Sequence, residues 1–370
     1  MDAVSSCALT STSRSELRAM TVGGTVGDDF KLRATLPTLD WLLLHGAQVV
    51  VCSHLGRPGG KVDPRYAMNP VRTAMATIRP GVEVMENLRF DPGEESNDSA
   101  FVIRLIEGFD AYVNDAFGAC HRSHASIVGP PMLLPSAAGR LLQREVEALE
   151  RVLVQPSRPF VAIVGGAKVA DKLGVLRSLA ERADYLLLGG AMCFTFLAAL
   201  GHEVGASHIE PTLINEARSL LATHPNIVLP TDFVALQPGA TAGNIDVIET
   251  TGPDLAASYQ GMDIGPDTRS TFSNVIARAG TVLWNGPMGV FEDPRFASGT
   301  RSVGEAVASS EGFTVVGGGD TVSAIHQFGL DARVGHLSTG GGATLELLEY
   351  GDLPGIAALR ANALQHLGRS

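Results

Sequence analysis

The sequence is short of cysteine, of long apolar runs and of positive charge, and each shortage excludes a class of protein. Four cysteines without a CxxC pair indicate neither a disulfide framework nor a zinc site, and this favours a reducing compartment. Lys and Arg number 28 against 39 Asp and Glu, and the net charge of −11 argues against a general binder of nucleic acids or membrane surfaces. Local clusters of basic side chains and backbone N–H groups must therefore hold any anionic ligand. The cysteines are Cys7, Cys52, Cys120 and Cys193.

The most apolar segment, residues 185–201, contains internal glycines and is short for a membrane span. It is interpreted as a buried strand, a glycine turn and a core helix. The chain does not open with a charged region followed by an apolar run and a cleavage site, so a secretory signal is not expected. Together with the scarce cysteines, these features predict a cytoplasmic protein.

The length of 370 residues predicts two domains. With 45% apolar residues, 18% charged residues and 42 glycines, the composition is typical of a folded, loop-rich α/β protein. Short runs of Val, Ile and Leu alternate with helical periodicity, which indicates parallel βαβ units buried on both faces. Nearly every predicted strand ends in Gly, Asn, Asp or Ser. These residues matter because open α/β sheets bind ligands beyond the carboxyl ends of their strands. The predicted strands are 47–53, 111–115, 160–166, 185–190, 226–232, 281–286 and 313–320.

A long amphipathic helix is predicted over residues 136–154, with Ser136 as its N-cap. The polar, proline-containing stretch QPSRP follows it, and we place the domain boundary near residue 155. The apolar stripe of this helix consists of Leu142, Val146, Leu149 and Leu153.

Three basic segments follow or flank strands in the first half of the chain. An arginine side chain can bind phosphate or carboxylate through two parallel hydrogen bonds, so arginines gathered at one end of a sheet suit a small polyanion. Taken singly, each could equally be an isolated surface cation or a capping histidine, and His124 is the weakest candidate. The segments contain His54 and Arg57 (SHLGRPGG), Arg89 (ENLRFDPGEE), and His121, Arg122 and His124 (NDAFGACHRSHAS).

Glycine-rich turns follow strands in the second half. FVAIVGGAKVADK leaves a strand through Gly165 and Gly166 and is predicted to enter a helix with Lys168 and Lys172 on one face. Lysines at a helix N-terminus indicate a phosphate site. The segment is neither a Walker A motif nor a dinucleotide fingerprint.

Two further glycine runs, Gly317–Gly319 and Gly340–Gly342, are each predicted to begin a helix. Asp320 after the first run is either a plain N-cap or the carboxylate that holds a hydrated Mg²⁺ carrying nucleotide phosphates. The turn WNGPMGVFEDPRF would be a loop by default if it stood alone. It supplies Asn285, Pro287 and Glu292.

From about Asp28 to the C-terminus these segments together resemble the phosphoglycerate kinase family. The motifs SHLGRP, ENLRF.PGEE, VNDAFG, HR.HAS, GGAKV.DK, DIGP, WNGPMGVFE, GGGDT and STGGGA occur in the family's order with similar spacing. The resemblance implies two doubly wound parallel-sheet, Rossmann-like α/β domains joined by a long helix. Residues 1–155 would bind 3-phosphoglycerate and end in that helix, residues 156–345 would bind nucleotide, and residues 346–370 would return to the N-terminal domain.

Members of this family transfer a phosphoryl group between 1,3-bisphosphoglycerate and Mg·ADP, giving 3-phosphoglycerate and Mg·ATP. The resemblance therefore implies a cytoplasmic phosphotransferase, a monomer with small-molecule substrates and with Mg²⁺ as cofactor, and no nucleic-acid or membrane partner. The acyl phosphate is already activated, so such a reaction needs positioning and charge neutralisation and no general base.

The resemblance also implies roles for individual residues. The implied substrate-binding residues are Lys31, His54, Leu55, Gly56, Arg57, Arg89 and Arg122. The implied nucleotide-binding residues are Gly166, Ala167, Lys168, Lys172, Gly190, Gly261, Asn285, Pro287, Glu292, Gly318, Gly319, Asp320 and Thr321, with Asp320 also meeting the metal through Mg·nucleotide. The implied donors to the transferring group are Lys31, Lys168, Gly340, Gly341 and Gly342.

Two departures from the family pattern bear on activity. The family's first strand ends in a DFNxP-type motif that contacts the substrate, and this chain has CALTSTSRSELRAMTVGGTVG in that region. The first strand is therefore in doubt, and a sheet without it would lose a central strand. A frameshift or a wrongly assigned start would produce the same pattern.

The second departure lies in DDFKLRATLPT, residues 28–38, where Lys31 occupies the position of the family's catalytic arginine and Arg33 falls on a variable cation. Two residues apart on a helix, the two cations point to nearly opposite sides and cannot serve one ligand together. Lysine keeps the charge but loses the two-pronged contact, so reduced activity is expected. Ala191 stands where the family usually has glycine, and this change should have little effect on activity.

Phosphoglycerate kinase activity, in an impaired form, is the leading hypothesis. A second hypothesis is a non-catalytic homologue that binds nucleotide alone through an intact second domain. A third, an NAD-dependent dehydrogenase, is disfavoured because the dinucleotide fingerprint is missing and lysines stand at GGAKV.DK.

Overall fold

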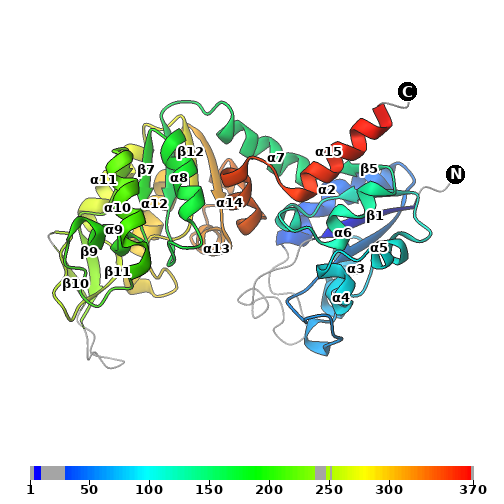
Figure 1. Ribbon diagram of the computed structural model, residues 1–370, viewed down its shortest axis with the longest axis horizontal. Coiled ribbons are helices and arrows are strands. Elements are labelled where there is room, and N and C mark those ends of the chain that lie inside the picture. Colours follow the sequence, from blue (N-terminus) through cyan, green and yellow to red (C-terminus); the bar gives the residue numbers. More distant parts are fainter. Residues whose placement is uncertain (1–3, 10–29, 238–246, 251, 368–370) are drawn as a thin grey trace. The chain divides into compact units, whose positions relative to one another are not determined.

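The protein is an α/β chain that divides into two compact units (Figure 1). The first unit consists of Met1–Glu147 and Tyr350–Ser370, and the second consists of Ala148–Glu349. Helix α7, Arg140–Leu153, begins in the first unit and ends in the second. The computed structural model describes residues 4–9, 30–237, 247–250 and 252–367.

The first unit is built on a five-stranded parallel sheet in the order β3-β2-β1-β4-β5. The strand order reverses at β1, because β2 and β3 extend the sheet on one side and β4 and β5 on the other. In doubly wound sheets, ligands bind beyond the carboxyl ends of the strands at such a reversal. The strands are β1 (Val4–Leu9), β2 (Gln48–Ser53), β3 (Glu83–Val84), β4 (Ala111–Asn114) and β5 (Ser136–Ala138).

The doubt about the first strand was wrong. Strand β1 lies at the centre of the sheet, with Val4 opposite Gln48 of β2 and Ala8 opposite Asn114 of β4. A parallel ladder is made by backbone groups, so the segment VSSCAL can pair on both edges without the family's usual strand sequence. Residues 10–29, which contain most of the segment lacking the DFN-type motif, lie outside the described residues.

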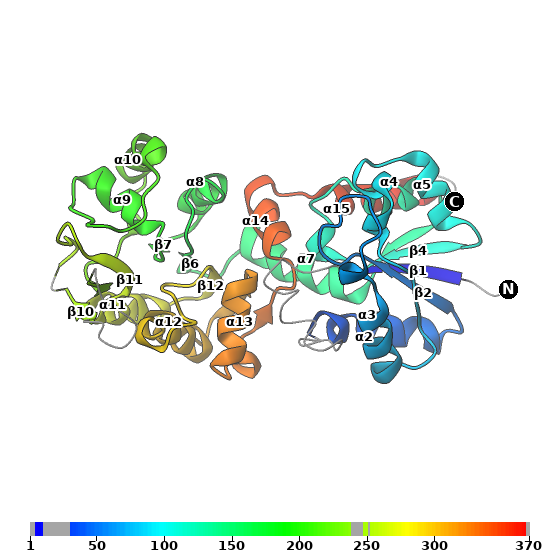
Figure 2. The ribbon, with the colours of Figure 1, turned by 90° about the horizontal axis from the view of Figure 1, so that it is seen from below.

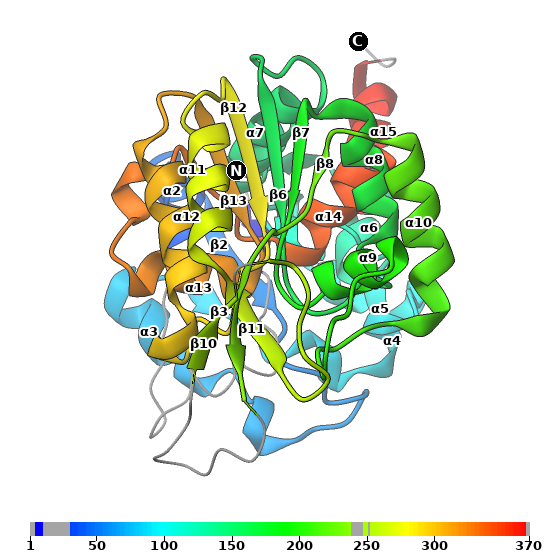
Figure 3. The same cartoon turned by 90° about the vertical axis from the view of Figure 1, so that its left-hand side faces the viewer.

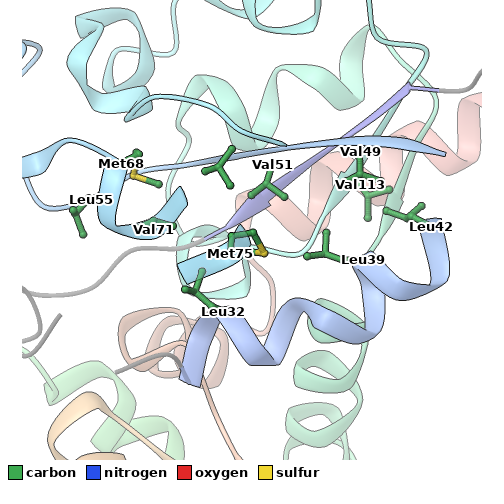
Figure 4. Close-up of a cluster of buried hydrophobic side chains, with 11 residues drawn as sticks. Leu32, Leu39, Leu42, Val49, Val51, Leu55, Met68, Val71, Met75 and Val113 are labelled. Atoms are coloured by element: carbon green, nitrogen blue, oxygen red, sulfur yellow. The ribbon is translucent and has the colours of Figure 1, made fainter. Parts of the chain in front are cut away.

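Helices cover both faces of this sheet (Figure 2). Figure 4 shows how α2 and α3 pack their apolar side chains against the sheet, where Leu39, Val51 and Met75 are fully buried. Helices α4, α5 and α15 lie on the opposite face. The helices are α2 (Phe30–Leu44), α3 (Asn69–Ile78), α4 (Pro92–Glu95), α5 (Ser99–Ile106), α6 (Ala125–Val128) and α15 (Pro354–Leu367).

The C-terminal helix α15 is fastened to the first unit by Asn362. Its side-chain amide donates to the carbonyl oxygens of Pro131 at 2.7 Å and Leu134 at 2.9 Å. Its side-chain oxygen accepts from the N–H of Ser136 at 3.0 Å. Helix α15 therefore packs on a unit whose sheet comes from residues 4–138.

Helix α7 starts later than predicted, and Ser136 is not its N-cap. Ser136 belongs to strand β5, where its hydroxyl donates to the carbonyl of Leu134. The cap is supplied by Asp115, which follows β4 and is 1% exposed. Its carboxylate accepts from the N–H groups of Leu141 at 2.9 Å and Leu142 at 3.1 Å, while burial raises its pKa. The prediction failed because β5 uses the residues that the helical pattern had included.

The second unit is built on a six-stranded parallel sheet in the order β14-β13-β12-β6-β7-β8, and its order reverses between β6 and β12. Strands β6 and β12 are buried throughout their length. All seven strands predicted from the sequence are present in the two parallel sheets, which confirms the predicted fold class. The strands here are β6 (Phe160–Val164), β7 (Tyr185–Leu188), β8 (Ile227–Val228), β12 (Thr281–Asn285), β13 (Phe313–Gly317) and β14 (His336–Leu337).

Helices α8 and α10 lie on one side of this sheet and α11 and α12 on the other (Figure 3). Crossover connections between parallel strands are right-handed. Because the chain builds the sheet outward from its centre in both directions, right-handed crossovers put the helices of the two halves on opposite faces. The helices of the unit are α8 (Leu173–Arg182), α9 (Cys193–Leu200), α10 (Ile214–Thr223), α11 (Pro266–Ile276), α12 (Ser298–Ser309), α13 (Gly319–Gln327) and α14 (Gly341–Tyr350).

The second unit also carries an antiparallel sheet that the sequence pattern did not predict, with the order β10-β9-β11. Its strands are β9 (Phe233–Leu236), β10 (Val247–Glu249) and β11 (Gln260–Ile264). Among the helices of the described ranges, none is both long and apolar enough to cross a membrane.

Candidate functional site

Basic side chains of the first unit gather where β2 and β4 end. His54 follows β2 directly, and Lys31 stands in the first turn of α2. Burial is the largest cause that lowers the pKa of His54, and the charges of Arg89, His124, Lys31 and His121 lower it further. These groups come from four separate segments, so the mutual effect shows that the fold brings them together.

Arg89 is the best-anchored member of this basic cluster. It belongs to the short 3₁₀ turn Leu88–Phe90, and its side chain is 11% exposed. Its guanidinium donates to the carbonyl of Gly56 at 2.8 Å and lies 3.2 Å from the carboxylate of Glu95. Arg57 and Arg122, in contrast, are exposed. One arginine is thus fixed by the protein while two others are accessible to a ligand.

The histidines of the cluster are neutral at neutral pH. Burial and the charge of Arg122 lower the pKa of His121 to about 4, and the pKa of His54 is also well below its usual value. Burial and Arg89 lower the pKa of His124 as well. Positive charge near pH 7 therefore comes from the arginines and Lys31, while neutral histidines can offer hydrogen bonds to an anion.

Glu94 is a member of this region that sequence reasoning missed. It is 1% exposed and accepts from the backbone N–H of Ser126 at 3.0 Å and from the Ser126 hydroxyl at 2.7 Å. Its Oε1 lies 3.8 Å from His124 Nδ1, and burial raises its pKa. His124 itself occupies the N-cap position of α6. The acidic pair in DPGEE was the available signal, but the pattern does not show which of its two carboxylates is buried.

In the second unit, Lys172 lies where the strand order reverses between β6 and β12. Its Nζ donates to the carbonyl of Gly165 at 2.7 Å and to the side-chain oxygen of Asn285 at 3.0 Å. Removal from water lowers the pKa of Lys172 to about 8, although the nearby charges of Asp320 and Asp171 oppose that shift. The ammonium group therefore joins the ends of the two central strands.

The prediction that Lys168 and Lys172 share one helical face was wrong. Helix α8 begins at Leu173, and residues 165–172 form a loop between β6 and that helix. Gly166 has a φ of +97°, which turns the chain out of the strand before any helix can start. Lys168 is exposed in this loop, whereas Lys172 reaches back to the strand ends.

Backbone hydrogen bonds join this loop to the last residue of β12 and to the turn that follows it. The N–H of Gly165 donates to the carbonyl of Asn285 at 3.0 Å, and the N–H of Gly166 donates to that of Pro287 at 3.0 Å. Gly190, after β7, has a φ of +65°, and a Cβ there would overlap the backbone of Gly166. A side chain at Gly190 would therefore collide with backbone where the three strand ends meet.

Two glycine-rich helix starts adjoin each other. Helix α13 begins at Gly319 and α14 at Gly341, and a Cβ on Gly341 would lie 3.4 Å from the Cα of Gly318. Asp320 is exposed in the first turn of α13. Thr321 is buried, and its hydroxyl accepts from the N–H of Gly286 at 2.7 Å. The hydroxyl of Thr321 is therefore used by the protein, and Asp320 lies near enough to Lys172 for its charge to raise the pKa of that lysine.

The remaining predicted positions occupy neighbouring elements. Gly261 lies in β11, where a Cβ would overlap the ring of Phe194. The next residue, Met262, accepts from the N–H of Val290 at 3.1 Å, which ties β11 to the turn containing Pro287. Glu292 is exposed beyond this turn. Sequence reasoning missed Thr300, whose hydroxyl accepts from the N–H of Met288 at 3.1 Å.

The polar groups at the start of α13 suit a metal ion that binds together with a phosphate-bearing ligand. Among the residues described here, no group of three or more His, Cys, Asp or Glu side chains could hold a metal ion. Mg²⁺ is commonly bound by one or two carboxylates together with ligand phosphates. The exposed carboxylate of Asp320 beside glycine amides fits that arrangement.

Comparisons with known proteins agree on one family. The family model described as phosphoglycerate kinase matches residues 18–84 and 71–351. A phosphoglycerate kinase of Thermomicrobium roseum is 48% identical over 92% of this chain and 94% of its own length. A phosphoglycerate kinase of Thermus thermophilus is 46% identical over 91% of this chain and 93% of its own length.

Solved structures give the same result. The structure of phosphoglycerate kinase from Coxiella burnetii has a TM-score of 0.87 and 32% identity, covering 98% of this chain and 97% of the other. That from Pyrococcus horikoshii has a TM-score of 0.84 and 29% identity with the same coverage.

Replacing Gly190 tests the close packing of the strand ends. We expect Gly190→Ala to lower the free energy of unfolding by about 3 kcal/mol or more, because left-handed strain adds to the overlap with Gly166. Gly201→Ala is the control, since its φ is +93° but a Cβ there meets nothing within 4 Å. It should cost about 1–2 kcal/mol from backbone strain alone. Urea unfolding measures both, and equal losses would contradict the packing argument.

Proposed function

The chain belongs to the phosphoglycerate kinase family, and on that premise we propose that it transfers a phosphoryl group between 1,3-bisphosphoglycerate and Mg·ADP, giving 3-phosphoglycerate and Mg·ATP. The observation that carries the proposal is that each unit presents cationic or backbone N–H donors at the carboxyl ends of its own parallel sheet. A reaction between two anionic substrates requires two such regions.

The first unit is proposed to bind 3-phosphoglycerate. Arg57 and Arg122 are exposed beside the anchored Arg89, so their guanidinium groups can bind phosphate and carboxylate oxygens. His54 adds a neutral hydrogen-bonding group, because its pKa is well below its usual value. The backbone of Leu55 and Gly56 continues from β2 into the same region.

The second unit is proposed to bind the nucleotide. Lys172 and the amides of Gly318 and Gly319 would hold its phosphates, and Asn285 would keep Lys172 in place. Mg²⁺, when bound with the nucleotide, would neutralise phosphate charge, and Asp320 is the residue proposed to hold it. The predicted contacts of Gly261 and of Glu292 at the ribose stay predictions.

In this reaction the protein's residues are proposed to position the substrates and to neutralise charge. Lys168, Lys31 and the amides at the start of α14 would stabilise the negative charge on the transferring phosphoryl group. Donors that are held in place before the reaction would limit reorganisation during transfer. The acyl phosphate is already activated, so no residue is assigned as a general base.

A coupled spectrophotometric assay with saturating Mg·ATP and 3-phosphoglycerate tests the proposal. We expect detectable but weak turnover, because the DFN-type motif is absent and Lys31 replaces an arginine. No turnover above background, together with calorimetric binding of Mg·ADP but not of 3-phosphoglycerate, would contradict the proposal. That result would instead support a homologue that only binds nucleotide, a reading favoured by the missing motif.

Replacing Lys31 tests its position in the site. Its charge acts on His54, which places it beside the basic cluster, whereas Arg33 is exposed two residues later on α2. We expect Lys31→Arg to raise turnover at least about tenfold, because arginine contacts to a transferring phosphoryl group are worth about 10³ or more elsewhere. Arg33→Lys is the matched control and should leave turnover unchanged. An unchanged rate in Lys31→Arg would show that this position does not meet the transferring group.

The pKa of Lys172 predicts a pH dependence of nucleotide binding. The ammonium form binds phosphate, and the pKa of about 8 means that the free protein loses this charge as the pH rises through 8. Calorimetry between pH 7 and 10 should show the Kd for Mg·ADP rising by up to about tenfold per pH unit above 8. Lys172→Arg should bind with no such rise, because arginine stays charged over this range. A flat profile in the unmodified protein would contradict the assignment.

A further inference from the structure

Glu210 lies far from the proposed phosphate loop in sequence but contacts it in the fold. It stands between α9 and the 3₁₀ turn Pro211–Leu213. Its own N–H donates to the hydroxyl of Thr195 at 3.0 Å, and Thr195 is buried on α9. The backbone at Glu210 is thereby attached to a buried helix, which gives its side chain a fixed base.

The carboxylate of Glu210 binds two consecutive backbone N–H groups of the loop 165–172. One oxygen accepts from Val169, and the other accepts from Ala170 at 3.2 Å. Hydrogen bonds from an N–H to a carboxylate are stronger than those to a neutral oxygen. The side chain of Val169 is fully buried beside this contact. Glu210 therefore holds the middle of the loop that carries Lys168 and Lys172.

The two ends of the loop are held differently. Gly165 is bonded to the last residue of β12 and Gly166 to the turn after it, and the N–H of Met192 donates to the carbonyl of Gly166 at 3.0 Å. Farther along, the N–H of Lys172 donates to the carbonyl of Val169 at 2.9 Å. The turn from Val169 to Lys172 thus starts at the residue that Glu210 fixes, so the position of the Lys172 side chain depends on that carboxylate.

We propose that Glu210 is a positioning residue, which sets the shape of the loop 165–172 so that Lys168 and Lys172 meet the nucleotide phosphates. The proposal rests on the proposed function of this loop. The carboxylate of Glu210 accepts from backbone N–H groups, and it acts through the two lysines. Its carboxylate also occupies two adjacent N–H donors that would otherwise attract a phosphate to the wrong part of the loop.

Hydrogen exchange tests whether Glu210 holds the loop 165–172, and it does not depend on enzyme activity. In the full-length protein, Glu210→Ala should accelerate deuterium uptake of peptide 166–172 at least about tenfold, because it removes two charge-assisted hydrogen bonds and the loss of one alone corresponds to about that factor. Uptake in the β12 segment 281–285 should stay unchanged. Glu210→Gln should give a smaller effect, because the amide oxygen can still accept from one N–H while its NH₂ group faces the other. Glu203→Gln is the matched control, since Glu203 is exposed seven residues earlier.

Kinetics and binding test the link to the nucleotide. In the coupled assay, Glu210→Ala should raise the KM for Mg·ATP about tenfold and leave the KM for 3-phosphoglycerate unchanged. Partial recovery in Glu210→Gln would support positioning. Unchanged uptake in peptide 166–172, or faster uptake with an unchanged nucleotide KM, would overturn the proposal. If the unmodified protein shows no turnover, the proposed function fails separately, and the Kd for Mg·ADP replaces the KM in deciding the role of Glu210.

Discussion

The second unit depends on one constraint, which is that the amine of Lys172 must lie between the ends of β6 and β12. Its bonds to Gly165 and Asn285 bring a positive charge to the point where the strand order reverses. The strand ends approach so closely there that a Cβ on Gly165, Gly190 or Gly286 would overlap neighbouring backbone. The start of α13 lies beside this point, since a Cβ on Gly318 would lie 3.2 Å from Asn285 Nδ2, and the start of α14 adjoins Gly318 in turn.

The first unit differs from the second because it gathers several positively charged side chains in one place. Three arginines and Lys31 stand near three histidines, and their mutual repulsion together with burial keeps the histidines neutral. The buried Glu94 and the partly exposed Glu95 supply negative charge beside Arg89. These carboxylates offset part of the positive charge of Arg89, while Arg57 and Arg122 are exposed. An anion that binds there replaces repulsion between cations with attraction, which favours a compact, highly charged ligand.

The sequence predicted much of this arrangement, because strand periodicity and strand-end glycines are local signals. It placed all seven of its strands, and it selected Lys172, Asn285 and Arg89 from short motifs. It could not show that α8 starts only at Leu173, because the turn at Gly166 is set by contacts with other strands. It missed Glu94 and Glu210, since their importance comes from partners 32 and 41 residues away. The doubt about β1 arose because the DFN-type motif is missing. That absence was a poor guide, since the pairing of a strand depends on backbone groups and not on the motif.

The bonding of Asn362 to residues 131–136 means that the first unit is made of two separate stretches of chain. The second unit is one continuous stretch, Ala148–Glu349, that lies between them. During synthesis from the N-terminus, all residues of the second unit leave the ribosome before the last helix of the first. The unit whose sheet is made first is thus completed after the second unit, and the surface that α15 covers stays exposed to water until that helix emerges.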